Sequence, residues 1–260
     1  MRRYVVALRL ALVLVFVLAG LVEVCQAQDP PEKATKESVK ESSDKPADAP
    51  ESQPDQKKDD PNLAPLEIKL PKPAFKGTPK HIPPGTNLEK PRKGPRPKFM
   101  APKGAKLVSA GQPVIASDNE PIVGEIKFVT DDDKSADEGS YVELGPGLQY
   151  VQIDLKKKVA IQAVLIWHYH ANARVYHDVV VQVADDADFI TNVRTLFSND
   201  HDNSSGLGMG TSKEYWETYE GKLIDGQGSE ARYIRLYSNG STTDDQNHYV
   251  EVDVYATPAK

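Results

Sequence analysis

Three consecutive carboxylates, Asp131-Asp132-Asp133, are the residues of this chain whose type and spacing point most directly to chemistry. Their negative charges repel one another unless a cation or water screens them. Carboxylate oxygens on a loop are hard ligands of the kind that Ca²⁺ prefers. The run therefore predicts either a calcium loop or a solvated acidic turn, and these residues by themselves favour the acidic turn.

Histidines are the second group with chemical potential. Five of the six lie in the second half of the chain: His168, His170, His177, His201 and His248. His168 and His170 are two residues apart on a predicted strand, so they share a face and could bind zinc with Asp200 or Asp202 as a third ligand. A His-x-His pair is a weak signal. A hydrogen-bonded, structural role at a strand end is the favoured interpretation.

The loop NDHDNSSGLGMG, 199–210, is rich in oxygen donors and glycine. Counted from Asp200, its twelfth position is Thr211, where an EF-hand requires glutamate, so the loop is not an EF-hand. The sequence also has no phosphate-binding glycine loop followed by a helix and lysine, and no nucleophile elbow. We therefore expect a protein that is not an enzyme, with a metal-dependent enzyme built on the histidines as a minor alternative.

Strands are the elements that must position these residues. Three successive segments alternate apolar and polar residues with a period of two: YVQIDL at 150–155, AIQAVLIWHYH at 160–170 and YHDVVVQVADD at 176–186. The apolar faces comprise Val151, Ile153 and Leu155; Ile161, Ala163, Leu165 and Trp167; and Val179, Val181 and Val183. Such faces need a second sheet or closure to cover them. The pattern predicts an antiparallel β-sandwich or barrel with Trp167 in its core.

Further strands are predicted on both sides of this stretch. They are LVSAGQPVIASD at 107–118, KEYWETYEG at 213–221, ARYIRLYS at 231–238 and NHYVEVDVYA at 247–256, with Val250, Val252 and Val254 facing inward. DFITNVRTLFSND, 188–200, is predicted to be irregular. About eight short strands without an amphipathic helix indicate one all-β domain over 105–258.

Residues 1–27 have the features of a secretory signal peptide. Arg2 and Arg3 precede the run 8–22, which is apolar apart from Arg9, and Ala27 offers a cleavage point before Gln28. A retained membrane anchor is the alternative, although the run is shorter than the roughly 20 apolar residues that span a bilayer. Acylation at Cys25 is a weaker one. Cleavage predicts a secreted, periplasmic or cell-surface protein.

Cleavage after Ala27 would remove Cys25, the only cysteine, so the mature fold would depend on its core, or on a metal, without disulfides. The net charge of −6 argues against nucleic acid as a partner.

Residues 28–104 are predicted to be a disordered linker rich in Pro, Lys and Asp. Sixteen of the 20 prolines lie between Pro30 and Pro102, and such a composition cannot bury enough apolar area to offset its ordering entropy. The apolar residues of its second half follow no helical or strand period: Leu63, Leu66, Ile68, Leu70, Phe75, Ile82, Leu88 and Phe99. The alternative is an extended strap laid over the sandwich or over a partner.

The order of the segments resembles the discoidin, or coagulation factor V/VIII C-type (F5/8 type C), domain. The similar segments are LVSAGQPVIASD, FVTDDDKS, YVQIDL, the N-x-R turn before YHDVVVQVADD, ARYIRLYS and YVEVDVYA. This family belongs to the galactose-binding-like β-sandwiches, together with carbohydrate-binding module family 32. The sequence departs from the pattern at Tyr150, where tryptophan is frequent, and at Asp132 and Lys156, where glycine is common.

The resemblance implies two sites. Asp131, Asp133 and Glu251 match the positions that hold a structural calcium, which raises calcium slightly above the acidic turn. Asn172 matches a sugar-binding asparagine, with His168 or His170 in place of a basic residue and Arg174 following it. Tyr169 is a candidate for stacking on a sugar ring.

We therefore predict an exported, non-catalytic β-sandwich that binds carbohydrate of a cell surface or matrix polymer through loops at one end. The alternative is a structural or protein-interaction module of a surface assembly, in which the same end contacts a protein.

Overall fold

The computed structural model describes residues 60–74 and 87–260, and strands dominate this part of the chain. The strands are β1 (Leu63–Pro65), β2 (Met100–Pro102), β3 (Lys106–Leu107), β4 (Val114–Ala116), β5 (Val142–Leu144), β6 (Gln149–Trp167), β7 (Val180–Ala184), β8 (Arg194–Ser198), β9 (Lys222–Ser238), β10 (Asn247–Tyr249) and β11 (Glu251–Pro258). Within these residues the helical element is a 3₁₀ turn, η1 (Ile126–Thr130). The predicted all-β class is confirmed.

The predicted signal peptide, 1–27, lies outside the described residues. Across 60–74 and 87–260, no helix has the length and apolar character needed to cross a membrane.

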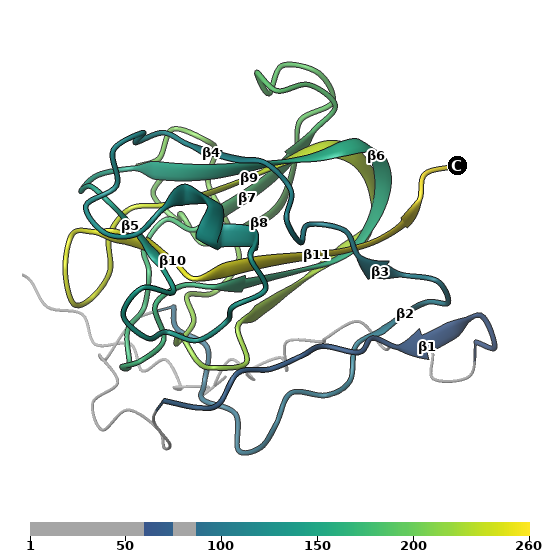
Figure 1. Cartoon of the computed structure of the whole chain (residues 1–260), viewed down its shortest axis with the longest axis horizontal. Coiled ribbons are helices and arrows are strands. Elements are labelled where there is room, and N and C mark those ends of the chain that lie inside the picture. Colours follow the sequence, from purple (N-terminus) through teal and green to yellow (C-terminus); the bar gives the residue numbers. More distant parts are fainter. Residues whose placement is uncertain (1–59, 75–86) are drawn as a thin grey trace, which may run out of the picture. The chain divides into compact units, whose positions relative to one another are not determined.

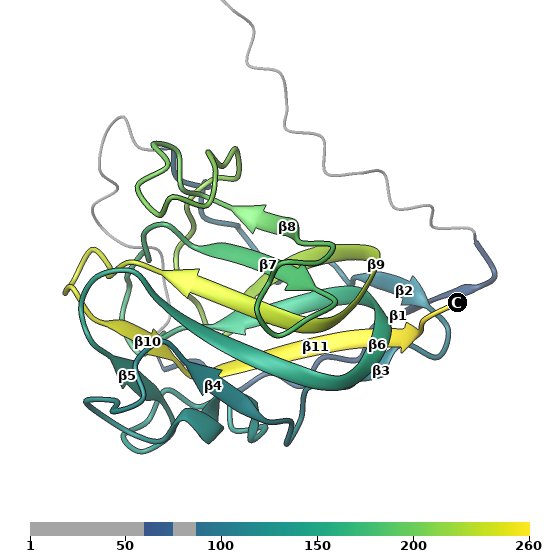
Figure 2. The same ribbon diagram turned by 90° about the horizontal axis from the view of Figure 1, so that it is seen from above.

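One long antiparallel ladder, β6 with β9, organises the domain and bends in its middle (Figures 1 and 2). The pairing register shifts between Asp154 and Val159, and at this bend Lys156 has a φ of 67°, a left-handed conformation that favours glycine. The Asp154 carboxylate fixes the turn, since it accepts hydrogen bonds from the Lys156 backbone N–H (2.8 Å) and from Arg232 Nε (2.8 Å) and Nη2 (3.0 Å). The Arg232 pair lowers the pKa of Asp154 to about 2.

The bend converts a single seven-stranded sheet into two facing layers. The first half of β6 pairs with β4 and with the second half of β9, which continues into β7 and β8. The second half of β6 pairs with the first half of β9 and with β11, which is bordered by β3. A separate short pair joins β5 to β10. This architecture is the predicted antiparallel β-sandwich.

The core between the layers contains the predicted faces of the first and third segments. Val151, Ile153, Leu155, Val179, Val181 and Val183 are all at most 3% exposed and belong to one cluster. They pack against Val164 and Ile166 from the second half of β6 and against Val252 and Val254 of β11.

The second predicted segment divides its residues between two faces. Ile161 belongs to the core between the layers, but a register shift between Ile161 and Ala163 reverses the alternation. Ala163, Leu165 and Trp167 consequently point to the outer face of their layer, where they form a second cluster with Tyr255. Trp167 is fully buried, as predicted, although it lies in this second cluster.

The outer cluster is covered by residues 60–74 and 87–104, which we call the strap. Its β1 and β2 pair with each other, and the Leu66 backbone N–H donates to Phe99 O at 2.8 Å. Leu66, Ile68 and Phe99 pack against the cluster. In both views the strap runs along this side of the sandwich (Figures 1 and 2).

The strap is also tied to the loop before β9. Glu214 exchanges backbone hydrogen bonds with Asn87 (3.0 Å) and Glu89 (2.8 Å). Glu220 accepts from Arg92 Nη2 at 2.5 Å and from the Arg96 backbone N–H at 3.1 Å. For the described part of 28–104, these contacts differ from the disordered-linker prediction and agree with the strap alternative.

Three element predictions differ from the structure. KEYWETYEG, 213–221, forms no regular strand; Glu214 makes an isolated bridge with Leu88. The predicted irregular segment 188–200 contains β8, which pairs with β7. Val250 joins the outer cluster, because it lies between β10 and β11 where the alternation is interrupted.

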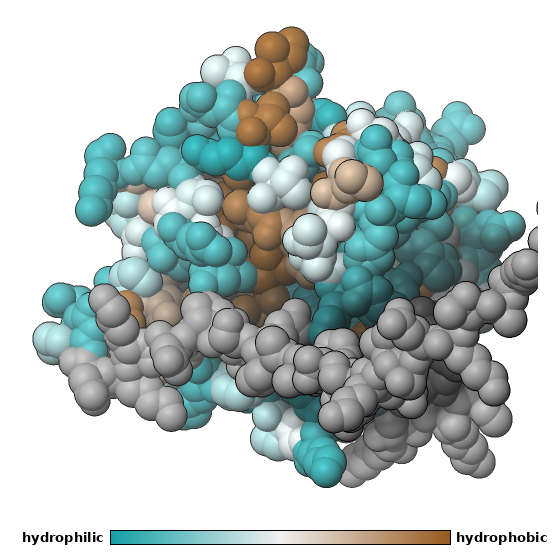
Figure 3. All heavy atoms as spheres, turned by 180° about the vertical axis from the view of Figure 1, so that it is seen from behind, coloured by the Kyte–Doolittle hydropathy of each residue, from teal (hydrophilic) through white to brown (hydrophobic). Residues whose placement is uncertain are grey.

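Exposed apolar surface is limited on the described part of the molecule. On the face in Figure 3, apolar residues form a narrow band and one protruding tip among hydrophilic residues. The large apolar side chains that are exposed are Leu70, Ile115, Ile122, Leu148, Ile190, Val193 and Met209. Most of the apolar area is enclosed by the two layers and by the strap.

Replacing Phe99 with alanine should destabilise the domain by roughly 1–3 kcal/mol, because the ring covers the outer cluster but is only half-buried. Urea denaturation followed by tryptophan fluorescence would measure this change. Leu70→Ala is the matched control, because Leu70 is 41% exposed and its truncation should cost less than about 0.5 kcal/mol. Equal stabilities of Phe99→Ala and the parent would contradict a packed strap.

Candidate functional site

Two tyrosines lie together at the end of the sandwich where β5, β6 and β10 end or begin. Tyr141 directly precedes β5, and Tyr169 is the second residue after β6. Their ring centroids are 5.0 Å apart with an edge-to-face angle of 69°. His248 of β10 lies 5.8 Å from both rings. Both tyrosines are half-buried, so this pair presents aromatic surface at the loop end of the domain.

Arg174 packs against the ring of Tyr169. Its guanidinium carbon is 4.8 Å from the Tyr169 ring centroid, and the residue is only 4% exposed. Nε donates to Asn172 Oδ1 at 3.0 Å, and Nη1 pairs with Asp244 Oδ2 at 3.1 Å. Asn172 is exposed and its oxygen accepts from Arg174, which leaves the two N–H donors of its amide as the groups that a ligand could meet.

A buried hydrogen-bond chain fixes the protonation of His248. The Tyr176 hydroxyl accepts from Arg174 Nη1 (3.4 Å) and therefore donates its own proton to His248 Nδ1 (3.0 Å). The remaining imidazole N–H is at Nε2, 3.4 Å from Glu143 Oε2. Burial and the nearby Arg174 charge lower the pKa of His248 to about 4, so the ring is neutral at pH 7.

Acidic side chains border the aromatic pair. Asp244 is 30% exposed and Glu143 is 18% exposed at the side chain, and they approach His248 from its two ring nitrogens. Burial raises the pKa of Glu143, and the Asp244 charge raises it further while Arg174 opposes. Desolvation by burial is the main cause that raises the pKa of the Tyr141 phenol. The nearby charge of the exposed Glu138 raises it further.

The structure brings together three of the predicted ligand-binding residues, Tyr169, Asn172 and Arg174. It places the other two, His168 and His170, in the interior at 0% and 1% exposure. Their burial corrects the prediction that they contact a ligand at the surface, because neither ring reaches it.

The two histidines have separate internal partners. His168 Nδ1 is 2.7 Å from Glu217 Oε1, and its ring stacks on Tyr176 at 4.4 Å. His170 Nε2 is 3.0 Å from Lys134 O. The zinc hypothesis with Asp200 or Asp202 is not favoured, because among the described residues no metal-type cluster contains a histidine.

The predicted calcium residues meet only in part. The Asp131–Asp133 turn does contact the closing strand, since the Asp132 backbone N–H donates to Glu251 Oε2 at 3.1 Å. Asp131 Oδ1 and Asp133 Oδ1, however, accept backbone hydrogen bonds from within their own turn, from Asp133 and Ser135, at 3.0 Å each. Asp132 has a φ of 69°, a left-handed conformation that favours glycine.

Lys134 supplies a cation at this place. Its side chain is 3% exposed, and Nζ lies 2.5 Å from Asp132 Oδ1 and 3.2 Å from Asp253 Oδ1. Burial opposes the charged form of Lys134, but Asp132, Asp253 and Glu251 outweigh it and raise its pKa. Burial also raises the pKa of Glu251 to about 9, with Lys134 opposing and Asp253 adding to the shift.

This arrangement does not fit a calcium ion well. The buried Glu251 Oε1 has no hydrogen-bond partner and would suit a cation. Yet among the described residues, one group of three carboxylates has ligand atoms that all lie within 4.8 Å of one another, and it comprises Asp178, Asp200 and Asp202. Asp131, Asp133 and Glu251 do not form such a group. An ammonium group already lies beside these carboxylates.

The other acidic cluster is internally satisfied. Asp200 is buried, and its two oxygens accept hydrogen bonds from the backbone N–H groups of Ser204 (3.1 Å) and Ser205 (3.0 Å). Asp178 Oδ2 accepts from Ser204 Oγ at 3.0 Å and from Asn239 Nδ2 at 2.8 Å. These bonds account for the glycine-rich loop 199–210 as a self-contained turn.

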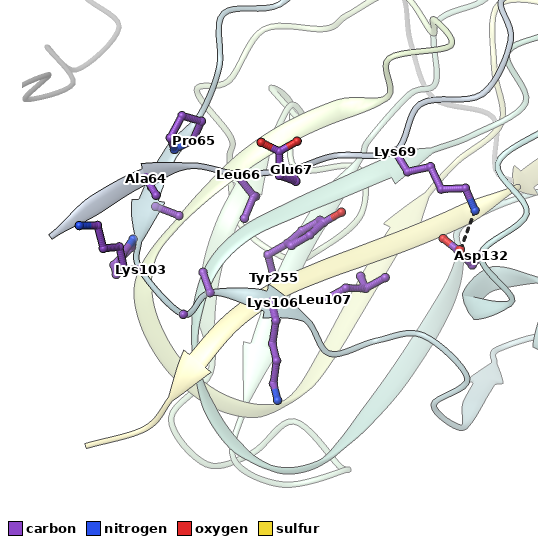
Figure 4. Close-up of a pocket in the computed structure, with 14 residues that line it drawn as sticks. Ala64, Pro65, Leu66, Glu67, Lys69, Lys103, Lys106, Leu107, Asp132 and Tyr255 are labelled. Carbon is purple, nitrogen blue, oxygen red and sulfur yellow. Dashed lines mark hydrogen bonds and ion pairs between the residues drawn. The ribbon is translucent and has the colours of Figure 1, made fainter.

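A cavity of about 420 Å³ lies under the strap (Figure 4). Leu66 of the strap points toward Tyr255 across it, and Pro65 and Leu107 also line it. Two of its lining polar groups are paired: Lys69 Nζ bonds Asp132 Oδ2 at 3.0 Å, and the Tyr255 hydroxyl donates to Asp253 at 3.2 Å. The cavity forms where the strap crosses the sheet. The candidate site is therefore the end of the sandwich that carries Tyr141 and Tyr169.

Several solved structures are similar to this chain. The family 32 carbohydrate-binding module of AlyQ, in complex with 4,5-unsaturated mannuronic acid, shares 18% identity with a TM-score of 0.41 over 55% of this chain and 92% of that one. Chitosan-binding module 1 from a chitosanase/glucanase of Paenibacillus sp. IK-5 shares 16% identity, TM-score 0.40, over 58% and 99%. The Streptococcus pneumoniae fucose-binding module SpX-3 shares 14% identity, TM-score 0.41, over 58% and 98%.

Some of the similar structures are parts of larger enzymes, such as the family 89 glycoside hydrolase of Clostridium perfringens, of which the match covers 15%. No protein-family model and no curated protein matches the chain.

Sequence reasoning missed half of the candidate site. Tyr141, Glu143, Asp244 and His248 lie in segments far from Tyr169 along the chain, and no spacing signal links them. A weak signal exists for Tyr141, an aromatic residue directly after an acidic, glycine-containing loop.

Lys134→Met should destabilise the domain by roughly 3–5 kcal/mol, because it leaves buried carboxylates without their cation. Thermal unfolding monitored by circular dichroism would show this loss, whereas Lys127→Met, at a side chain 70% exposed, should stay within about 0.5 kcal/mol. EDTA should shift the parent melting temperature by less than about 1 °C. A rise of several degrees on adding Ca²⁺ to the EDTA-treated parent would restore the calcium prediction.

Acidification should lower the free energy of unfolding, because the folded protein keeps the His248 ring buried and neutral. Its pKa is about 4 when folded and about 6.5 when unfolded, so the unfolded chain binds more protons between these values. The free energy of unfolding should therefore fall by up to roughly 3 kcal/mol as pH drops from about 6.5 to about 4. Urea titrations across this range should show a shallower fall for His248→Gln, and an unchanged one for the exposed His201→Gln. Parallel curves for His248→Gln and the parent would refute this origin of the slope.

Proposed function

We propose that this domain is a non-catalytic carbohydrate-binding module whose ligand lies on Tyr141 and Tyr169 at the loop end. The observation that carries the proposal is this half-exposed aromatic pair, with the exposed Asn172 amide beside it. A sugar ring has an apolar C–H face and a polar edge, and aromatic surface next to a few oriented polar groups complements both.

Rigidity of the platform supports this role. Tyr169 is held by the Arg174 guanidinium at 4.8 Å, and Arg174 is held by Asp244 and Tyr176. A ligand would therefore meet groups that are already ordered, which reduces the entropic cost of a weak, shallow contact.

Export is part of the same proposal. The features of residues 1–27 lead to the secreted, periplasmic or cell-surface setting in which surface glycans and matrix polymers are accessible. The alternative, a protein-interaction module, would use the same end of the sandwich.

Tyr169→Ala should weaken binding to the best glycan about tenfold or more, because it removes the stacking surface. Asn172→Ala should weaken it roughly threefold to tenfold through one lost hydrogen bond. Affinity electrophoresis in polysaccharide gels and a glycan array would give these values. Tyr233→Ala is the control, because Tyr233 is a half-buried tyrosine like Tyr169 but lies away from the site. It stands opposite Asp154 in the strand register, beside the bend of β6.

Retention that is unchanged in Tyr169→Ala would place the ligand elsewhere. An absence of retention on every glycan would favour the protein-interaction module.

A further inference from the structure

We propose that the loop-end site selects glycans carrying a positively charged amino group, such as glucosamine polymers, over neutral and acidic glycans. This inference rests on the proposed carbohydrate-binding function and names the ligand class of the same site. The inferred selectivity depends on the charged side chains that border the aromatic pair and on which of them already form ion pairs.

The border of the site carries more negative than positive charge. Asp244 is balanced by its ion pair with Arg174 at 3.1 Å. Glu143 and Glu138 have no ion pair with a lysine or arginine among the described residues. The basic group in contact with Glu143 is the His248 ring, 3.4 Å away, which is neutral at pH 7. The Arg174 charge acts on Glu143 without pairing with it. Two carboxylates beside the tyrosines therefore lack a direct ion pair with a lysine or arginine.

The positive groups near the site are not available to an acidic ligand. Arg174 has a side chain only 5% exposed, and it lies behind the Tyr169 ring. Lys134 is buried at 3% and is paired with Asp132 and Asp253. Lys69, although exposed, is paired with Asp132 at 3.0 Å. A uronate carboxylate would thus meet like charge without an opposing cation.

A protonated amine has the complementary chemistry. It offers three N–H donors, whereas carboxylates are acceptors only. A charge-assisted bond to Glu143 is stronger than one from a neutral hydroxyl, particularly because this carboxylate is largely enclosed at 18% exposure. N-acetylation of the same amine would remove both the charge and two of the donors.

The test compares three oligosaccharides of equal length made from glucosamine, N-acetylglucosamine or galacturonic acid. Calorimetric titration of the full chain at about pH 6 keeps the amine protonated, because amines of this kind lose their proton nearer neutrality or above. The glucosamine oligomer should bind at least about tenfold more tightly than the other two. Its affinity should fall several-fold when salt rises from about 0.05 M to about 0.5 M.

Glu143→Gln should reduce the affinity for the glucosamine oligomer about threefold to tenfold and should affect the weak binding of the N-acetylated oligomer less. Glu138→Gln should have a smaller effect of the same sign, because Glu138 is more exposed. Glu230→Gln, near the bend of β6, is the control and should change nothing.

Equal, salt-independent binding of the neutral and amino oligomers, or preference for the galacturonic acid oligomer, would overturn the charge selection. The carbohydrate-binding function would survive that result if Tyr169→Ala still abolished binding. Failure of all three oligomers and of the glycan array would instead remove the proposed function itself.

Discussion

The bend in the β6–β9 ladder is the feature on which the rest of the structure depends. It allows one continuous sheet to supply both layers of the sandwich, so the core is enclosed without a disulfide. Asp154 holds the bend through Arg232 and through the backbone of Lys156, a residue that adopts a left-handed conformation there. Loss of this network would remove the side-chain contacts that brace the bend.

The second half of β6 imposes a further requirement. After the register shift following Ile161, this strand is apolar on both faces. One face meets the opposite layer, and the other, which carries Leu165 and Trp167, is covered in part by the strap. The strap residues therefore pack as part of the domain, on the N-terminal side of the predicted start at Ala105.

The sequence made the all-β class and the inner faces predictable, because the alternation of Val151, Ile153 and Leu155 is unbroken. It did not reveal the reversed alternation after Ile161, since a bulge is set by pairing with β9 and leaves no mark in β6 alone. The linker prediction did not anticipate the strap for a related reason. Leu66, Ile68 and Phe99 follow no period because each contacts a different part of a surface that other segments create.

The site shows the same division between local and long-range information. Tyr169, Asn172 and Arg174 are close along the chain and were identified together. His168 and His170 were assigned to the surface, but they turn inward to Glu217 and to Lys134 O. Tyr141, Glu143 and His248 reach the site through the β5–β10 pair, which joins segments about a hundred residues apart. The acidic border therefore arises from the tertiary structure alone.

The strap also determines how the domain responds to tension. It lies in series between the N-terminal part of the chain and β3, so a pull from that side while the loop end holds a ligand must first peel the strap from the sandwich. Detaching the described strap residues, 60–74 and 87–104, frees roughly 110 Å of extended chain. The next contact along the chain is the pairing of β3 with β11, so the strap would detach before the sandwich itself is loaded.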